Sequence, residues 1–185
     1  MAYVSNEDVE PDTLRQGDLI QDVHLIGSLC FTDVAIPTIV GGGAVPKTWS
    51  VHSELPKGPV TVLSQCCEID RVNGVKLTSI ILAPVRDVSK ATRQDKLQEL
   101  IDSNDIVPGQ SSYSYLKYFF LEPHLALPFR DGGLVDFSKV FSVRKTSYDF
   151  LLERKIAQMS DSSRESMAMK LALYFYRARM QAEAA

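Results

Sequence analysis

A short segment, residues 64–70, gathers the side chains of this sequence that are best suited to chemistry. It reads SQCCEID, and its serine, glutamine, thiols and carboxylates can bind or react with a polar partner. The run VTVL at residues 60–63 comes directly before it, and its apolar and β-branched side chains fit a buried strand. Polar residues that follow a buried strand stand at the edge of a sheet. We therefore predict the functional site at this strand end.

Most of the segment is expected to contact a partner rather than to react with it. Amides, carboxylates and thiols can hydrogen-bond a ligand or a base edge, but Glu68 and Asp70 can equally shape the loop before the turn signal Asn73-Gly74. The expected binding residues are Gln65, Cys66, Cys67, Glu68 and Asp70.

A catalytic cysteine and a zinc site are two further interpretations of the same segment. Cys67 becomes a nucleophile if Glu68 or a histidine acts as its base, whereas free cysteines are more often small buried hydrophobes. Cys66 and Cys67 are adjacent, so they lack the spacing that brings two thiolates to one zinc ion. Three glycines at residues 41–43 lack the following lysine of a phosphate-binding loop. We therefore expect no metal and no cofactor.

Charge and cysteine content limit the function classes. The 185 residues carry a formal net charge of −3, of which residues 1–12 contribute four acidic and no basic side chains. The remainder is near neutral, so no strong electrostatic footprint for nucleic acid is evident. Three cysteines, an acidic N-terminus unlike a secretion signal and no long apolar run favour a reduced, cytoplasmic protein without a membrane span.

Apolar patterning places the elements that must position the site. Residues 1–13 are expected to form an acidic flexible arm, and residues 14–185 a single domain. Ser162 and Glu165 suggest a capping box for a long C-terminal helix, which packs on the domain or on a neighbouring subunit, with Lys170 on a solvated basic face. Strands are expected at residues 19–26, 58–63, 75–85, 115–121 and 134–143, with further extended pieces at residues 29–39 and 47–53, and helices at residues 89–103 and 161–180.

Three of these pieces resemble a known family in order and chemical type. RQGDLI at residues 15–20, GPVTVLS at residues 58–64 and LTSIILAPV at residues 77–85 are similar to core strands of MazF/PemK-like toxins. The resemblance covers roughly residues 14–88. Members are small SH3-like barrels that cleave RNA and usually pair with an antitoxin. The resemblance implies a mainly β (α+β) fold, an SH3-like barrel with a mid-chain helix and a long C-terminal helix.

The same resemblance implies roles for individual residues. In the family an Arg-Pro precedes the second strand and a serine or threonine ends it, and the two serve RNA cleavage. Ser64 matches the second position, but Lys57 stands where the arginine is expected. Lysine binds phosphate as a point charge and lacks the planar fork of arginine, so Arg15 is a further candidate for the phosphate. SQCCEI at residues 64–69 is also similar to the S-Q-x-C-D signature of uncharacterised bacterial proteins with this barrel core.

Two function classes follow. The near-neutral domain and the absent Arg-Pro favour a non-catalytic or regulatory binding module with residues 64–70 as its contact surface. The alternative is an endoribonuclease that cleaves single-stranded RNA with Ser64 and with Lys57 or Arg15. A protein partner, RNA and a second copy of the chain are the candidate partners.

Overall fold

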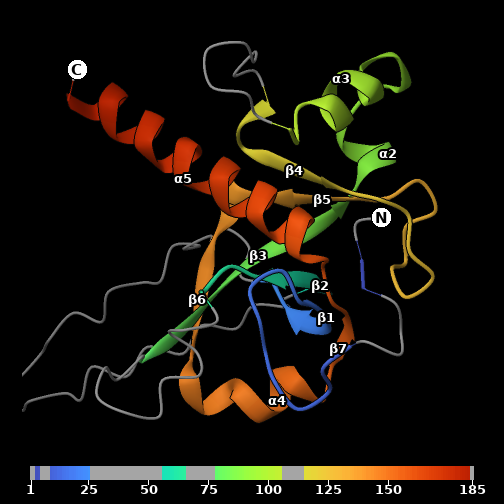
Figure 1. The fold of residues 1–185 in the computed structure, drawn as a ribbon, viewed down its shortest axis with the longest axis vertical. Coiled ribbons are helices and arrows are strands. Elements are labelled where there is room, and N and C mark those ends of the chain that lie inside the picture. Colours follow the sequence, from blue (N-terminus) through green and yellow to red (C-terminus); the bar gives the residue numbers. More distant parts are fainter. Residues whose placement is uncertain (1–2, 5–8, 26–55, 66–77, 106–114, 184–185) are drawn as a thin grey trace, which may run out of the picture.

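The protein is built around an antiparallel sheet of seven strands with helices on both faces (Figure 1). The computed structural model describes residues 3–4, 9–25, 56–65, 78–105 and 115–183. The strands are β1 (Leu19–His24), β2 (Lys57–Val62), β3 (Ser79–Asp87), β4 (Tyr118–Leu121), β5 (Gly133–Asp136), β6 (Phe141–Arg144) and β7 (Lys155–Ala157).

Strand β3 is the centre of the sheet. One of its edges pairs with β2, and the other pairs with β6 along its first half and with β5 along its second half. The order of the strands is β4-β5-β3-β2-β1-β7, with β6 beside β3. Among the described residues the two ends of this path do not pair with each other. The mainly β, α+β fold is therefore confirmed, but the expected closed barrel is not what these strands form.

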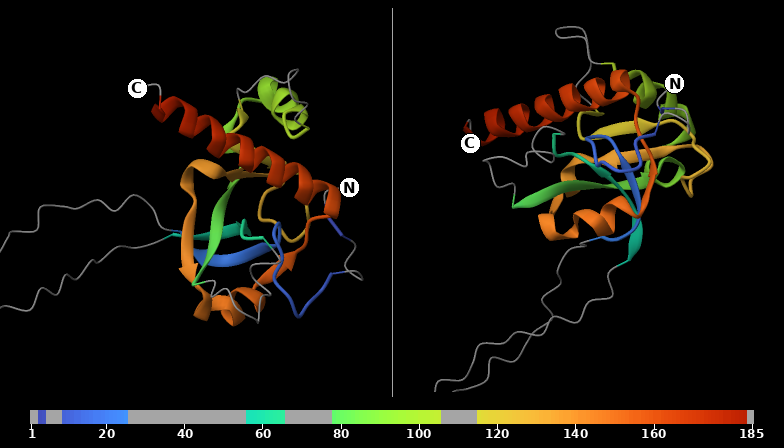
Figure 2. Two further views of the ribbon diagram at one scale, coloured as in Figure 1. Left: turned by 60° about the vertical axis from the view of Figure 1, so that its left-hand side comes forward. Right: turned by 60° about the horizontal axis from the view of Figure 1, so that its bottom comes forward.

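In the residues that the structure describes, four α-helices and three short 3-10 helices connect and cover the strands. Helix α5 lies across one face and α4 lies beyond the opposite face (Figures 1 and 2). The α-helices are α2 (Val88–Ala91), α3 (Leu97–Asp102), α4 (Tyr148–Leu152) and α5 (Asp161–Glu183), and the 3-10 helices are η1 (Gln94–Lys96), η3 (Phe137–Lys139) and η4 (Lys145–Ser147).

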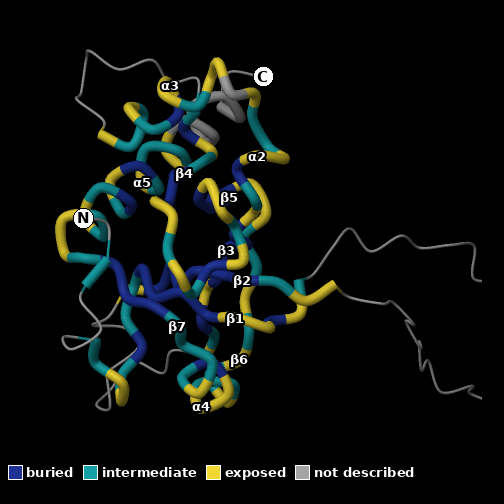
Figure 3. Tube along the Cα trace, turned by 90° about the vertical axis from the view of Figure 1, so that its right-hand side faces the viewer, coloured by how far each residue is buried: buried dark blue, intermediate teal, exposed yellow. Residues whose placement is uncertain are grey.

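Alternation along the strands gives the sheet two cores. Leu19 belongs to the core that includes Met167 of α5, whereas the next residue, Ile20, belongs to the core that includes Leu151 of α4. Successive side chains of a strand point to opposite faces, so β1 and β3 each supply both cores, and a third, smaller cluster joins β4 and β5 to α3. The strands accordingly form the buried centre of the chain in Figure 3. Full burial of each such side chain stabilises the fold by about 1.5–3 kcal/mol.

Several expected elements are interrupted. The helix expected at residues 89–103 is divided into α2, η1 and α3, because Thr92 is in extended conformation after α2. The strand expected at residues 134–143 is divided by η3, whose first residues are capped by the Asp136 carboxylate through Ser138 N at 3.1 Å. A side chain that caps the backbone in this way competes with the strand ladder.

The long C-terminal helix is confirmed, with a different N-terminal cap. Helix α5 begins at Asp161, but the capping oxygen is Ser160 Oγ, which accepts from Ser163 N at 3.4 Å. The expected capping box at Ser162 and Glu165 is therefore displaced by two residues. A serine immediately before the first helical residue satisfies an N–H group that the helix itself leaves unpaired.

The N-terminal segment, expected as a flexible arm, is anchored where the structure describes it. Tyr3 forms an antiparallel bridge with Met159, and Val4 N donates to Gln158 O at 3.0 Å. The Tyr3 hydroxyl donates to Glu122 O at 3.0 Å, and burial raises the pKa of this hydroxyl. The start of the chain thus lies against the segment between β7 and α5.

Candidate functional site

Ser64 follows the end of β2 as predicted, but its hydroxyl accepts a hydrogen bond from the neighbouring strand β3. The residue is 3% exposed, and Ser64 Oγ accepts from Ile81 N at 2.9 Å, next to the backbone bond from Leu63 N to Ile81 O at 2.9 Å. The hydroxyl therefore extends the pairing of β2 with β3 by one hydrogen bond. A hydroxyl in this role is worth about 0.5–1.5 kcal/mol to the fold.

The rest of the predicted contact surface falls mainly outside the described residues. Gln65 follows Ser64 and is exposed. Cys66, Cys67, Glu68 and Asp70 lie in the range 66–77, which the structure does not describe. The described part of the predicted site is thus one exposed amide beside one buried hydroxyl.

Lys57 is not brought to Ser64. It is the first residue of β2, is exposed, and pairs in register with His24 of β1. Ser64 follows the other end of the strand, about 20 Å away at the rise of an extended chain. The two residues that the toxin family would use together therefore stand at opposite ends of β2.

Arg15 lies closer to Ser64. Gly17 N donates to Val62 O at 2.8 Å and Gln16 Nε2 donates to Leu63 O at 2.9 Å, which holds the turn of residues 15–18 at the end of β2. The Arg15 guanidinium, however, is 2.5 Å from a carboxylate oxygen of Glu10. Glu10 balances this charge, so Arg15 adds little net positive potential beside Ser64.

A buried ion pair under this turn was not foreseen from the sequence. Lys155 Nζ lies 2.9 Å from Asp18 Oδ2, which also accepts from Arg15 N at 2.7 Å. Lys155 Nζ donates in addition to Glu10 O at 2.8 Å, Thr13 O at 3.0 Å and Gln158 Oε1 at 3.0 Å. Burial raises the pKa of Asp18 to about 6, against the opposing effect of Lys155. The pair joins β7 to the turn before β1 and to the N-terminal segment.

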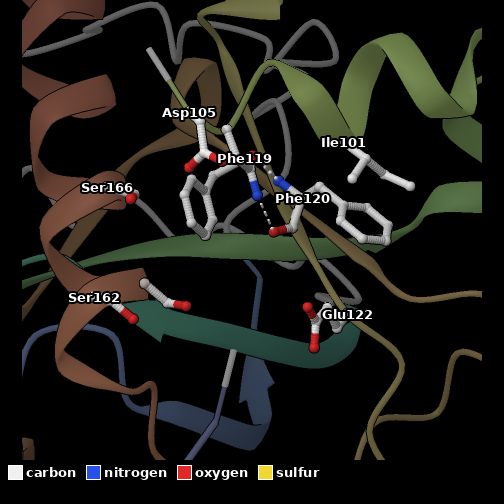
Figure 4. A pocket seen from close by; sticks show the side chains of 9 residues that line it. Ile101, Asp105, Phe119, Phe120, Glu122, Ser162 and Ser166 are labelled. Carbon is white, nitrogen blue, oxygen red and sulfur yellow. Dashed lines mark hydrogen bonds between the residues drawn. The ribbon is translucent and has the colours of Figure 1, made fainter. Parts of the chain in front are cut away.

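A polar groove of about 250 Å³ lies between the start of α5, the strand β4 and the end of α3 (Figure 4). In the figure Ser162 and Ser166 of α5 form one wall, and Asp105 and Glu122 lie across from them. Carboxylates accept hydrogen bonds and hydroxyls both donate and accept them. This combination suits a polar group with positive charge. The groove is lined by Ile101, Asn104, Asp105, Phe119, Phe120, Glu122, Ser162, Ser163 and Ser166.

A buried lysine stands behind one wall of the groove. Lys170 of α5 is 0% exposed, and Lys170 Nζ donates to Ser103 Oγ at 2.8 Å and to Asn104 Oδ1 at 3.5 Å. Burial lowers the pKa of Lys170 to about 7, with a smaller opposing effect from Asp105. The expected solvated position of Lys170 is therefore wrong. Its place among Met167, Leu171 and Tyr174, at helical spacing, was the signal that it faces the core.

Metal and membrane features can be assessed only over part of the chain. In the described ranges no three histidine, cysteine, aspartate or glutamate side chains come together as metal ligands, and the adjacent cysteines lie outside those ranges. Across the same ranges no helix combines the length and the apolar character needed to cross a bilayer.

Comparison with known proteins adds no assignment. The chain matches no protein-family model, and no curated protein matches it.

Proposed function

We propose that the chain is a non-catalytic or regulatory binding module, built on an opened form of an SH3-like core of the MazF/PemK type, with residues 64–70 as its contact surface. Three observations support the core. The segments that resemble the family lead into β1 and overlap β2 and β3, these strands are consecutive in the sheet, and they pair antiparallel. The partner that fits a near-neutral domain is a protein rather than an RNA backbone.

The position of Ser64 is the observation that carries the proposal against catalysis. Its hydroxyl is buried and accepts from Ile81 N, Lys57 lies at the far end of β2, and Arg15 is paired with Glu10. General acid–base or nucleophilic groups must come within hydrogen-bond reach of the reacting atoms. These three residues do not form such an arrangement, and of the proposed contact surface Gln65 is exposed.

The first experiment separates the binding module from an endoribonuclease. Purified protein is incubated with mixed single-stranded RNA beside Lys57→Ala and Ser64→Ala variants, while induced expression is followed by growth. We expect intact RNA and normal growth with all three proteins. RNA cleavage by the wild type that both substitutions abolish would overturn the proposal and support the endoribonuclease. Lys57 is exposed, so its variant keeps the test valid if Ser64→Ala lowers stability.

The second experiment tests the contact surface. Proteins crosslinked in cells to the wild type are quantified beside those crosslinked to a Gln65→Ala, Cys67→Ala, Glu68→Ala variant. A matched control carries Lys90→Ala on α2, which is exposed and belongs to a different edge of the fold. We expect a partner whose yield falls at least about tenfold with the triple variant only. Equal yields from the three proteins would show that residues 64–70 are not the contact surface.

A further inference from the structure

The polar groove beside α5 is a cavity that the proposed contact surface does not use. It has a volume of about 250 Å³, and none of residues 64–70 lines it. Pockets for drug-sized ligands measure about 300–1,000 Å³, so the groove fits a smaller molecule or a single side chain of a partner. An inference about this groove therefore stands apart from the function proposed for residues 64–70.

The floor of the groove is apolar and held in place. Phe119 and Phe120 of β4 are 2% and 6% exposed, and Ile101 of α3 completes the apolar lining. The Asn104 side chain bonds the Phe120 backbone in both directions: Phe120 N donates to Asn104 Oδ1 at 2.9 Å, and Asn104 Nδ2 donates to Phe120 O at 2.7 Å. A floor fixed in this way suits the apolar stem of a small ligand.

The walls of the groove carry polar atoms that the fold does not use. In the described part of the chain, neither the Asp105 carboxylate nor the Ser166 hydroxyl forms a hydrogen bond or an ion pair. Figure 4 shows the Asp105 carboxylate pointing into the groove, with Ser166 on the side of α5. Glu122 adds a second carboxyl group to the lining. Carboxylate and hydroxyl oxygens accept hydrogen bonds, and an ammonium group has three N–H donors to give.

The positive charges of α5 near the groove are offset. The Arg164 guanidinium lies 2.9 Å from an oxygen of Asp161, which is itself in the first turn of the helix. The partial positive charge of the helix N-terminus is reduced by Asp161 and by the Ser160 Oγ that accepts from the backbone. Lys170 stands behind the wall, and because burial lowers its pKa to about 7 it is largely neutral at pH 8. The carboxylates therefore determine the sign of charge that the groove favours.

We propose that the groove binds a primary ammonium group on a short apolar stem. The stem lies on the rings of Phe119 and Phe120, and the ammonium group donates to the Asp105 carboxylate and to the Ser166 hydroxyl. A free aliphatic amine and a lysine side chain of a peptide share this chemistry. Both have one positive charge at the end of a flexible chain of methylene groups, and both are of a size that the groove admits.

An NMR titration with pentylamine tests the proposal. At pH 8 the amine is protonated, since primary ammonium groups of this kind have a pKa of about 10.4. The methyl resonances of Ile101 and the ring resonances of Phe119 report on the groove. We expect both to shift with pentylamine, whereas 1-pentanol, of the same length without the charge, should bind at least about tenfold more weakly. Pentanoate, with the opposite charge, should leave both resonances unchanged.

Variants test the charged wall. Asp105→Asn should weaken pentylamine binding by about threefold, as expected for an ion pair at the surface, and Asp105→Asn with Glu122→Gln should weaken it further. These substitutions keep the shape of the side chains, and both residues are exposed, so the fold is retained. The matched control is Asp95→Asn on η1, which removes the same charge from an exposed residue outside the groove and should leave the affinity unchanged.

The outcomes are distinct. Resonances that pentylamine does not shift at tens of millimolar would overturn the proposal. So would equal affinities for pentylamine and 1-pentanol, tighter binding of pentanoate, or a double variant that binds as well as the Asp95→Asn control. Lysine capped at both backbone ends distinguishes the sources: if it binds at least as tightly as pentylamine, the ammonium belongs to a peptide, and if it binds more weakly, to a free amine. Either result supports an ammonium site, and neither bears on residues 64–70.

Discussion

The described part of the protein buries two lysine ammonium groups in very different surroundings. Lys155 lies between β7 and the N-terminal segment, where one carboxylate and three neutral oxygens accept from it. Lys170 is a residue of α5 whose acceptors are one hydroxyl and one amide oxygen. Both side chains are almost fully buried, so the acceptors rather than the depth of burial distinguish them.

The difference indicates what each lysine contributes. Lys155 has a counter-ion and more acceptors than it has N–H groups, so its ammonium holds three segments together. Lys170 has no carboxylate among its hydrogen-bond partners, and its pKa falls to about 7. The first lysine is a structural clamp, while the second changes its charge near neutral pH, directly behind the polar groove.

The largest expected effect comes from removing the clamp. Lys155→Met should lower the free energy of unfolding by about 3–5 kcal/mol, because the Asp18 carboxylate stays buried without its counter-ion. Denaturant unfolding of wild type and variant, with the midpoint and slope fitted separately, measures this loss. The control is the double variant Asp18→Asn, Lys155→Met, which has no buried unpaired charge and should recover part of the loss. A single variant within about 1 kcal/mol of wild type would contradict the clamp.

Lys170→Met should act in the opposite direction. An apolar side chain of similar length removes a buried charge that lacks a counter-ion, so the variant should be more stable than wild type by about 1–3 kcal/mol at pH 6. Ser103 and Asn104 keep other partners, since Ser103 Oγ donates to Leu100 O and Asn104 bonds the Phe120 backbone. The measurement is again denaturant unfolding, now repeated across pH.

The pH profile separates this effect from simple repacking. The pKa of Lys170 is about 7 in the folded protein, against an ordinary value of 10.5. Between these values the unfolded chain binds the extra proton, so the stability of wild type should rise with pH from 7 to 10. Lys170→Met should lose that rise, yet retain the fall between about pH 4 and 6 that the raised pKa of Asp18 produces. An unchanged rise above pH 7 in the variant would contradict the assignment to Lys170.

The sequence predicted the elements whose pattern is long and strong. The strand at Val60 and Val62 and the helix beginning at Asp161 are where the apolar spacing placed them. The short elements α4 and β7 were not predicted, because five helix residues or three strand residues repeat their period too few times to give a recognisable pattern. The barrel closure was inferred from a resemblance of three strands, and the arrangement of the other strands does not follow from those three.

The candidate site could be located by pattern only in part. Ser64 stands at the predicted strand end, but whether its hydroxyl is free depends on Ile81, which belongs to another strand. The clamp was missed for a similar reason. Asp18 and Lys155 are far apart in the sequence, and the segment around each has the composition of an ordinary exposed turn or sheet edge. Contacts of this kind are decided by tertiary packing and leave no local signal in a single sequence.

The smallest expected effect tests whether the Ser103 hydroxyl stabilises the charged form of Lys170. Ser103→Ala removes the nearer acceptor, so it should cost about 0.5–1.5 kcal/mol and lower the pKa of Lys170 further. An NMR titration of the Lys170 side chain reads the pKa directly. Ser166→Ala is the matched control, since Ser166 lies one turn before Lys170 on α5 and also lines the groove. If Ser103→Ala lowers the pKa of Lys170 and Ser166→Ala does not, the charged form of Lys170 is stabilised by one hydroxyl, whereas Lys155 has a carboxylate. If the pKa of Lys170 is the same in both variants, the hydrogen bond to Ser103 does not stabilise the charged form.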